Sequence, residues 1–158
     1  MRLFEIDESK GSYASVKFNE ATTKALAEYQ EKISVPVALE ADEFHSTVMF
    51  SRKFVPDFKE LGEGLDWNGE FTGFEIFPSD DDNALVLTYS CPELEERFEY
   101  ITNEYGATWD HDDFIPHITL SYNVGDLDPA SLPAYDGPIT IISESGDDLD
   151  LEWVEDKK

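Results

Sequence analysis

The chain alternates between segments with the period of a β-strand and segments with the period of an α-helix. Apolar and polar residues alternate over residues 13–18, which predicts a strand with one apolar face. Residues 19–33 then place Leu26 and Tyr29 on one helical face, and Asn19 is a favourable N-cap. This region therefore predicts a strand followed by an amphipathic helix.

The same order of elements recurs in the second half of the chain. Residues 83–89 predict a strand, and Pro92 begins a helical segment in which Leu94 and Ile101 share one face. Gly106 is expected to end this helix. The repeated strand and helix indicate two similar halves.

Each predicted helix leads to a strand with one short pattern: His, a spacer, Thr and an aliphatic residue. The copies are HSTV, with His45 and Thr47, and HITL, with His117 and Thr119. Since successive side chains of a strand point to opposite faces, the His and Thr of each copy share one face. The opposite face is expected to pack into the core with these residues: Phe44, Val48, Phe50, Ile118, Leu120 and Tyr122.

One further strand is predicted after each histidine strand, at residues 70–77 and 138–145. Residues 147–153 alternate strongly and either extend or pair with the second of these. No segment has the composition of a linker, so residues 1–158 are expected to form one domain. We predict an α+β fold of two pseudo-symmetric β-α-β lobes, with helices on the outer faces and a central cleft where the sheets meet.

Composition agrees with a globular protein. The chain has 158 residues, of which 41% are apolar and 13% aromatic, enough to bury a core. No apolar run approaches the roughly 20 residues that span a membrane, and the N-terminal residues lack the pattern of a signal peptide. Cys91 is the single cysteine, which excludes an internal disulfide and a cysteine zinc cluster. We expect a cytoplasmic protein.

The charge is strongly negative, with 36 Asp and Glu against 11 Lys and Arg and a formal net charge of −25. Such a field repels duplex nucleic acid and anionic membranes, because phosphate binding depends on Lys and Arg. The charge is consistent with a solvated surface, with mimicry of a nucleic-acid backbone, or with adaptation to high salt. His111 lies in the acidic run DHDD, but no spacing matches a known calcium or zinc motif.

Two imidazoles and two hydroxyls converge if the predicted lobes face each other. A neutral imidazole accepts a proton from the attacking hydroxyl, and a protonated one donates to the leaving oxygen. The threonine hydroxyls donate hydrogen bonds to non-bridging phosphate oxygens. Acidic surroundings are expected to favour the imidazolium form of at least one histidine. This arrangement predicts phosphodiester cleavage without a metal, and it leaves open which histidine is the acid.

The duplicated motifs HSTV and HITL resemble the two signature motifs of the two-histidine (2H) phosphoesterase superfamily. The resemblance implies a bilobal α+β fold and activity, without metal or cofactor, on 2′,3′-cyclic phosphates or related phosphodiesters. It further implies that His45 and His117 are the catalytic acid–base pair and that Thr47 and Thr119 bind phosphate.

Within that superfamily, the compact size, the GSYASVKF strand, the motif spacing and the acidic tail are most similar to phage-encoded anti-CBASS phosphodiesterases. This implies cleavage of cyclic di- and trinucleotides such as 3′,3′-cGAMP in the host bacterial cytoplasm. It also implies that Tyr13 and Glu144 hold the nucleotide and that Trp153 and Phe74 stack on bases. The residues alone favour a surface charge for Glu144, and they place Trp153 and Phe74 in phase with core positions.

Other functions remain open at this point. They are a 2′,3′-cyclic-phosphate RNA phosphodiesterase of the same superfamily, a protein that sequesters a cyclic nucleotide without cleaving it, and a non-enzymatic acidic mimic of DNA. The acidity disfavours long RNA more than a small enclosed ligand, since remote charges are screened beyond roughly 8 Å. Arg52 and Lys53 either attract the phosphate or are ordinary loop charges.

Overall fold

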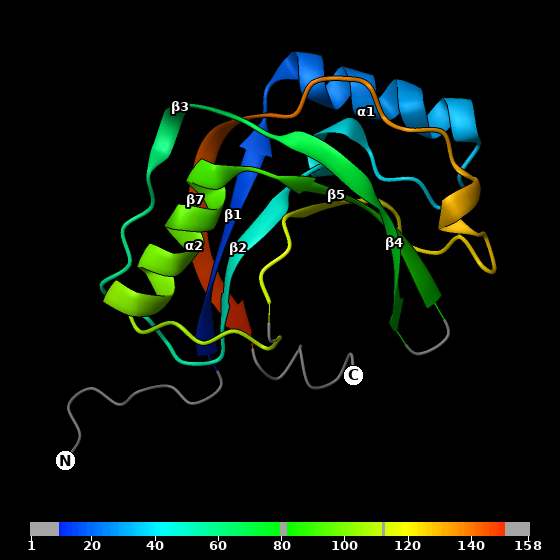
Figure 1. Ribbon diagram of the computed structural model, residues 1–158. Helices are drawn as coiled ribbons and strands as arrows, with labels where there is room; N and C mark the ends of the chain where they lie inside the picture. Colours follow the sequence, from blue (N-terminus) through cyan, green and yellow to red (C-terminus); the bar gives the residue numbers. More distant parts are fainter. Residues whose placement is uncertain (1–9, 80–81, 112, 151–158) are drawn as a thin grey trace.

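The computed structural model describes residues 10–79, 82–111 and 113–150, and its elements follow the predicted order with one addition. Two α-helices and seven strands lie within these residues (Figure 1). They are β1 (Lys10–Phe18), α1 (Glu20–Ile33), β2 (Ser46–Ser51), β3 (Gly62–Asn68), β4 (Glu70–Ser79), β5 (Asp82–Ser90), α2 (Pro92–Glu104), β6 (His117–Ser121) and β7 (Thr140–Asp150).

The strands form two antiparallel sheets, which confirms the α+β class. The first sheet has the order β2-β1-β7-β3 and the second has the order β4-β5-β6. Each has a histidine strand, β2 or β6, at one edge, with the strand that precedes a helix next to it. The strand that follows each histidine strand joins the sheet of the other half of the chain: β4 pairs with β5, and β7 pairs with β1. Each sheet therefore contains strands from both halves of the chain, and pseudo-symmetry of the halves stays a prediction.

Helix α1 begins as predicted and packs on the second sheet. The Asn19 side chain accepts a hydrogen bond from the Thr22 N–H at 2.9 Å, which caps the helix. Leu26 and Tyr29 are buried, and the Tyr29 ring stacks on Phe74 of β4 with 5.5 Å between centroids. The helix that follows β1 thus covers the sheet to which β1 does not belong.

Helix α2 packs on the first sheet, beside β2 and β7 (Figure 1). Leu94 and Ile101 are fully buried, as their spacing predicts. Gly106 follows the helix at φ +73°, a left-handed conformation that glycine adopts without strain. The apolar pattern missed Arg97, which is only 9% exposed and pairs with the buried Glu144 of β7.

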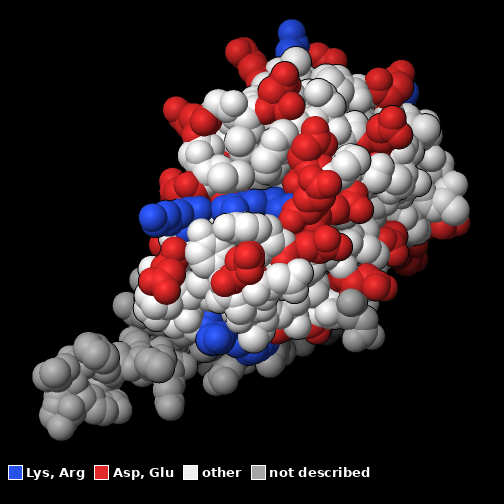
Figure 2. Space-filling model, turned by 60° about the vertical axis from the view of Figure 1, so that its left-hand side comes forward, with Lys and Arg blue, Asp and Glu red and all other residues white. Residues whose placement is uncertain are grey.

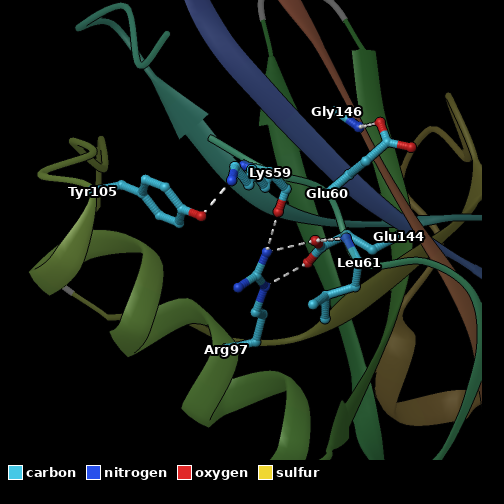
Figure 3. A network of polar contacts seen from close by, with 7 residues as sticks. All are labelled: Lys59, Glu60, Leu61, Arg97, Tyr105, Glu144 and Gly146. Carbon is cyan, nitrogen blue, oxygen red and sulfur yellow. Dashed lines mark hydrogen bonds and ion pairs between the residues drawn. The ribbon is translucent and has the colours of Figure 1, made fainter. Parts of the chain in front are cut away.

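The ion pair between Arg97 and Glu144 connects α2 to the first sheet (Figure 3). Arg97 Nε and Nη2 donate to the two carboxylate oxygens at 2.9 and 2.8 Å. Arg97 Nη2 also donates to the Lys59 carbonyl oxygen, and Glu144 Oε1 accepts from the Leu61 N–H, each at 3.0 Å. The pair therefore also fixes the segment between β2 and β3, and these bonds offset the cost of burying its charges.

Strand β3 is the addition that the sequence pattern did not predict. It lies at the edge of the first sheet, and none of its residues is buried. Gly62 and Gly64 have φ of +74° and +94°, and the pairing with β7 is irregular. Only Leu65 and Trp67 of this edge strand pack partly against the core, and this apolar alternation is too short to mark a strand in the sequence. By contrast, the segments predicted at 138–145 and 147–153 form one strand, β7, as far as Asp150.

Neither helix in the described part of the chain is long and apolar enough to cross a bilayer.

Replacing Arg97 by Met is expected to lower the free energy of unfolding by about 3–5 kcal/mol, because the Glu144 carboxylate is left buried without its partner. The double variant Arg97→Met/Glu144→Leu should recover most of this loss, as measured by urea titration with circular dichroism. Arg52→Met, which breaks the more exposed ion pair with Asp110, is the control and should cost no more than about 1 kcal/mol. Equal losses in the two single variants would contradict the role given to the buried pair.

Candidate active site

The two His-x-Thr motifs lie on the edge strands of the two sheets. His45 directly precedes β2 and Thr47 lies within it, whereas His117 and Thr119 both lie in β6. All four side chains are half-buried, and the spacer residue of each motif is fully buried. Each motif therefore presents its imidazole and hydroxyl on one face and packs its spacer into the interior, as the strand period predicts.

Both imidazoles are held in the same way. Nδ1 of His45 lies 2.8 Å from the carbonyl oxygen of Glu43, and Nδ1 of His117 lies 2.9 Å from that of Ile115. Because a carbonyl oxygen only accepts hydrogen bonds, Nδ1 carries the proton in both rings. Nε2 of each ring is then an acceptor when the ring is neutral and a donor when it is charged.

A β-bulge follows the threonine of each motif. The extra residue is Val48 against β1 and Leu120 against β5. The predicted core positions of Phe50 and Tyr122 are therefore wrong: Phe50 is half-buried and Tyr122 is 49% exposed. One inserted residue turns the following side chains to the other face, which simple alternation cannot reveal. The remaining predicted core positions of the two strands are buried: Phe44, Val48, Ile118 and Leu120.

A cavity of about 660 Å³ lies between the two sheets, where the sequence predicts a cleft. Its wall comes from β2, β4, β6 and the loop before β6. The lining residues are Thr47, Phe50, Phe77, Pro78, Trp109, Asp110, His111, Asp113, Ile115 and His117. His45 and Thr119 complete the motifs but do not line this cavity.

Tyr13 lies beside the first motif. Its Oη is 2.9 Å from Thr47 Oγ1. The strand register places Ser15, on the same face of β1 as Tyr13 and Lys17, opposite Thr47. Burial raises the pKa of the Tyr13 phenol, so it keeps its proton at neutral pH and can donate to the Thr47 hydroxyl. A contact between Tyr13 and substrate stays a prediction.

Glu144 is not brought together with the motifs. It pairs across strands with Val16, whereas Tyr13 occupies the alternate phase of β1, so Glu144 faces α2 from the opposite side of the sheet. Both of its carboxylate oxygens accept hydrogen bonds, from Arg97 and from the Leu61 N–H. The geometry gives Glu144 a structural role, and its contact with a nucleotide stays a prediction.

Different aromatic residues line the cavity from those that the sequence singled out. Phe74 packs against Tyr29, and Trp153 lies outside the described residues. Phe50, Phe77 and Trp109 line the wall instead. Phe77 could have been found from the sequence, because it is out of phase with Phe74 along β4. Nothing in the sequence of the loop marks Trp109 as a cavity residue.

Charged side chains surround the cavity without forming a metal cluster. Arg52 Nε and Nη2 each lie 3.0 Å from the carboxylate of Asp110, so Arg52 forms an ion pair with this acidic residue of the cavity wall. His111 lies next to Trp109, with 5.8 Å between ring centroids. Over residues 10–79, 82–111 and 113–150, no three His, Cys, Asp or Glu side chains are grouped so as to hold a metal ion.

The pKa of His117 is lowered from its ordinary value. Burial is the main cause, and the positive charges of His45 and His111 act in the same direction. The hydrogen bond to Ile115 and the charge of Glu75 raise the pKa and only partly compensate. For His117, burial thus outweighs the expected effect of acidic surroundings, and the ring is mostly neutral at pH 7. The influence of His45 indicates that the imidazoles are close enough to interact.

An NMR titration of His117 is expected to give a pKa below the ordinary histidine value of about 6.5. His45→Ala should raise this pKa by removing a neighbouring positive charge, and Glu75→Gln should lower it by removing a negative one. Far-UV circular dichroism controls for folding. If His45→Ala left the titration unchanged, the two imidazoles would be too far apart to act on one phosphate.

Comparison with known proteins finds relatives along nearly the whole chain. The family model for anti-CBASS protein Acb1 matches residues 10–156. The anti-CBASS protein Acb1 of Acinetobacter phage Ac42 is 35% identical over 153 residues, which cover 97% of this chain and 99% of the relative. That of Enterobacteria phage T4 is 36% identical over 157 residues, covering 96% and 97%, and that of Vibrio phage KVP40 is 33% identical over 162 residues, covering 98% and 97%. The chain therefore belongs to the Acb1 family of anti-CBASS proteins.

Proposed function

We propose that this protein is a phosphodiesterase that cleaves cyclic di- and trinucleotides, such as 3′,3′-cGAMP, and so counters CBASS immunity in a bacterial host. One observation carries the proposal: two imidazoles from different sheets are held identically through Nδ1, each beside a threonine hydroxyl. The names of the phage relatives and the resemblance of HSTV and HITL to the 2H motifs support it.

The lowered pKa of His117 suits it to act as the general base, and His45 then acts as the acid. In the proposed reaction, a ribose 2′-hydroxyl attacks the phosphorus attached to its own 3′-oxygen. Neutral His117 accepts the hydroxyl proton at Nε2 while the new O–P bond forms. The bond from phosphorus to the 5′-oxygen breaks, and His45 donates its Nε2 proton to that oxygen. A 2′,3′-cyclic phosphate and a free 5′-hydroxyl result, and attack by water opens the cyclic phosphate if hydrolysis is complete.

The threonine hydroxyls would stabilise the charge that develops on the non-bridging oxygens. When Tyr13 donates to Thr47 Oγ1, the threonine proton is left free for a phosphate oxygen. Thr119 lies two residues after His117, as Thr47 lies two residues after His45, so each imidazole has a hydroxyl on its face. Positioning and these hydrogen bonds would supply the rate enhancement beyond the about 10²–10⁴-fold that acid–base catalysis contributes.

The cavity fits a small cyclic nucleotide in size and composition. Its volume of about 660 Å³ lies within the range of ligand sites. Phe50, Phe77 and Trp109 offer aromatic faces to bases, where stacking is worth about 1–3 kcal/mol per base. No Lys or Arg is among its lining residues within the described chain, so the substrate would be held by stacking, hydroxyls and imidazoles.

A 2′,3′-cyclic-phosphate RNA phosphodiesterase is the second candidate, because the same four motif residues suit that substrate. The surface argues against it: acidic side chains far outnumber basic ones on the face in Figure 2, in keeping with the net charge of −25. A long RNA would meet this field along its whole length. A non-enzymatic DNA mimic would account for the charge but would leave the paired imidazoles without a role.

Cleavage of 3′,3′-cGAMP by the wild-type protein is expected in excess EDTA, with products separated by chromatography. His45→Ala and His117→Ala should each lower kcat by at least about 10²-fold, because each removes one proton transfer. Tyr29→Phe, which changes a tyrosine of α1, is the matched control and should retain activity. Intact 3′,3′-cGAMP together with opening of 2′,3′-cyclic phosphate RNA ends would favour the second candidate.

The rate should fall on the acid side as the pH drops through the pKa of His117, because the protonated ring cannot act as a base. Glu75→Gln removes a charge that raises this pKa, so the acid limb of kcat/KM should move to lower pH. His111→Gln removes a charge that lowers it, so the limb should move to higher pH. If the acid limb moved in the same direction in both variants, or in neither, the assignment of His117 as the base would be contradicted.

A further inference from the structure

The spacer residue of the first motif is polar and buried, and the proposed reaction does not use it. Ser46 is 1% exposed, whereas the corresponding spacer of the second motif, Ile118, is an apolar core residue. Ser46 Oγ donates to the carbonyl oxygen of His117 at 2.7 Å, and Tyr89 Oη donates to Ser46 Oγ at 2.7 Å. A buried chain of two hydroxyls therefore ends on the backbone of one histidine of the site.

The direction of these two hydrogen bonds follows from the groups that form them. A carbonyl oxygen only accepts, so the single Ser46 proton must point to His117, and Ser46 must accept from Tyr89. Burial raises the pKa of Tyr89 far above its ordinary value, so the Tyr89 hydroxyl keeps its proton at any working pH. No buried side-chain N or O among the described residues lacks a hydrogen-bond partner, so the hydroxyls of Ser46 and Tyr89 are both satisfied.

The hydrogen bonds from Tyr89 through Ser46 to His117 join the two sheets where the histidines lie. Ser46 belongs to β2 of the first sheet and directly follows His45, whereas Tyr89 and His117 belong to β5 and β6 of the second. The Tyr89 N–H also donates to the carbonyl oxygen of Pro116 at 3.1 Å. Tyr89 therefore holds the backbone on the N-terminal side of His117 directly and the His117 carbonyl through Ser46.

We propose that Ser46 and Tyr89 are positioning residues that set the distance and orientation between the imidazoles of His45 and His117. In its catalytic consequence this inference rests on the proposed function, since two imidazoles on one phosphodiester must keep a fixed separation. A displacement of about 1 Å is enough to lower the rate by about 10²-fold. The interaction between the two imidazoles is an independent consequence, because it depends on their distance and needs no substrate.

Ser46→Ala and Tyr89→Phe test the proposal, with Tyr29→Phe as the matched control. Tyr29 is also a buried tyrosine whose hydroxyl donates to a backbone carbonyl, that of Pro133, away from the motifs. For 3′,3′-cGAMP, Ser46→Ala and Tyr89→Phe should lower kcat by about tenfold with KM changed less than about twofold, since positioning and not binding is lost. Tyr29→Phe should keep kcat within about twofold of the wild type at a similar loss of thermal stability.

A second readout is the effect of His45→Ala on the NMR titration of His117, measured in the wild-type and Ser46→Ala backgrounds. The shift should be smaller in the Ser46→Ala background, because the imidazoles are no longer held together. Unchanged kcat and an unchanged shift would overturn the proposal, as would equal losses of kcat in all three single variants. If the wild type cleaves no cyclic nucleotide but the shift still depends on Ser46, the proposed function fails and the positioning role stands.

Discussion

The site depends on the contact between β2 and β6, because its two imidazoles belong to different sheets and no shared strand pairing fixes them. Ser46 bridges the strands at His117, and Gln30 of α1 donates from Nε2 to the carbonyl oxygens of Leu39 and Leu120. A bridge between Ala38 and Ser121 continues this junction. Ser46 thus joins β2 to β6 directly, and Gln30 and Ala38 hold the segment before β2 against β6; buried polar contacts of this kind are strong in a low dielectric.

The crossed connections explain why this junction is stable. Because β4 completes the sheet of the second half and β7 that of the first, the two halves of the chain cannot separate without breaking the pairings of β7 with β1 and of β4 with β5. Each helix likewise packs on the sheet opposite to the strand it follows. Each of the two bulges turns an aromatic residue, Phe50 or Tyr122, away from the core three residues after its motif threonine. Bulges next to functional sites commonly redirect side chains in this way.

Electrostatics divide the molecule into a buried and a solvated part. In the interior, Arg97 and Glu144 neutralise each other and hold α2, while burial keeps His117 mostly neutral. At the surface, a net charge of −25 is spread over solvated carboxylates, which water and salt screen. The protonation of His117 is therefore governed mainly by burial and by its immediate neighbours.

The sequence by itself determined what local periodicity controls: the strand and helix order, the caps at Asn19 and Gly106, and the shared face of each His-x-Thr pair. Such features depend on neighbours within a few residues, so their pattern is visible in one chain. Tertiary structure alone decided the strand crossover, the bulges, the edge strand β3, and the burial of Arg97 with Glu144. It also decided which aromatic residues face the cavity. These features arise from contacts between distant segments, whose pairing and packing no local period encodes.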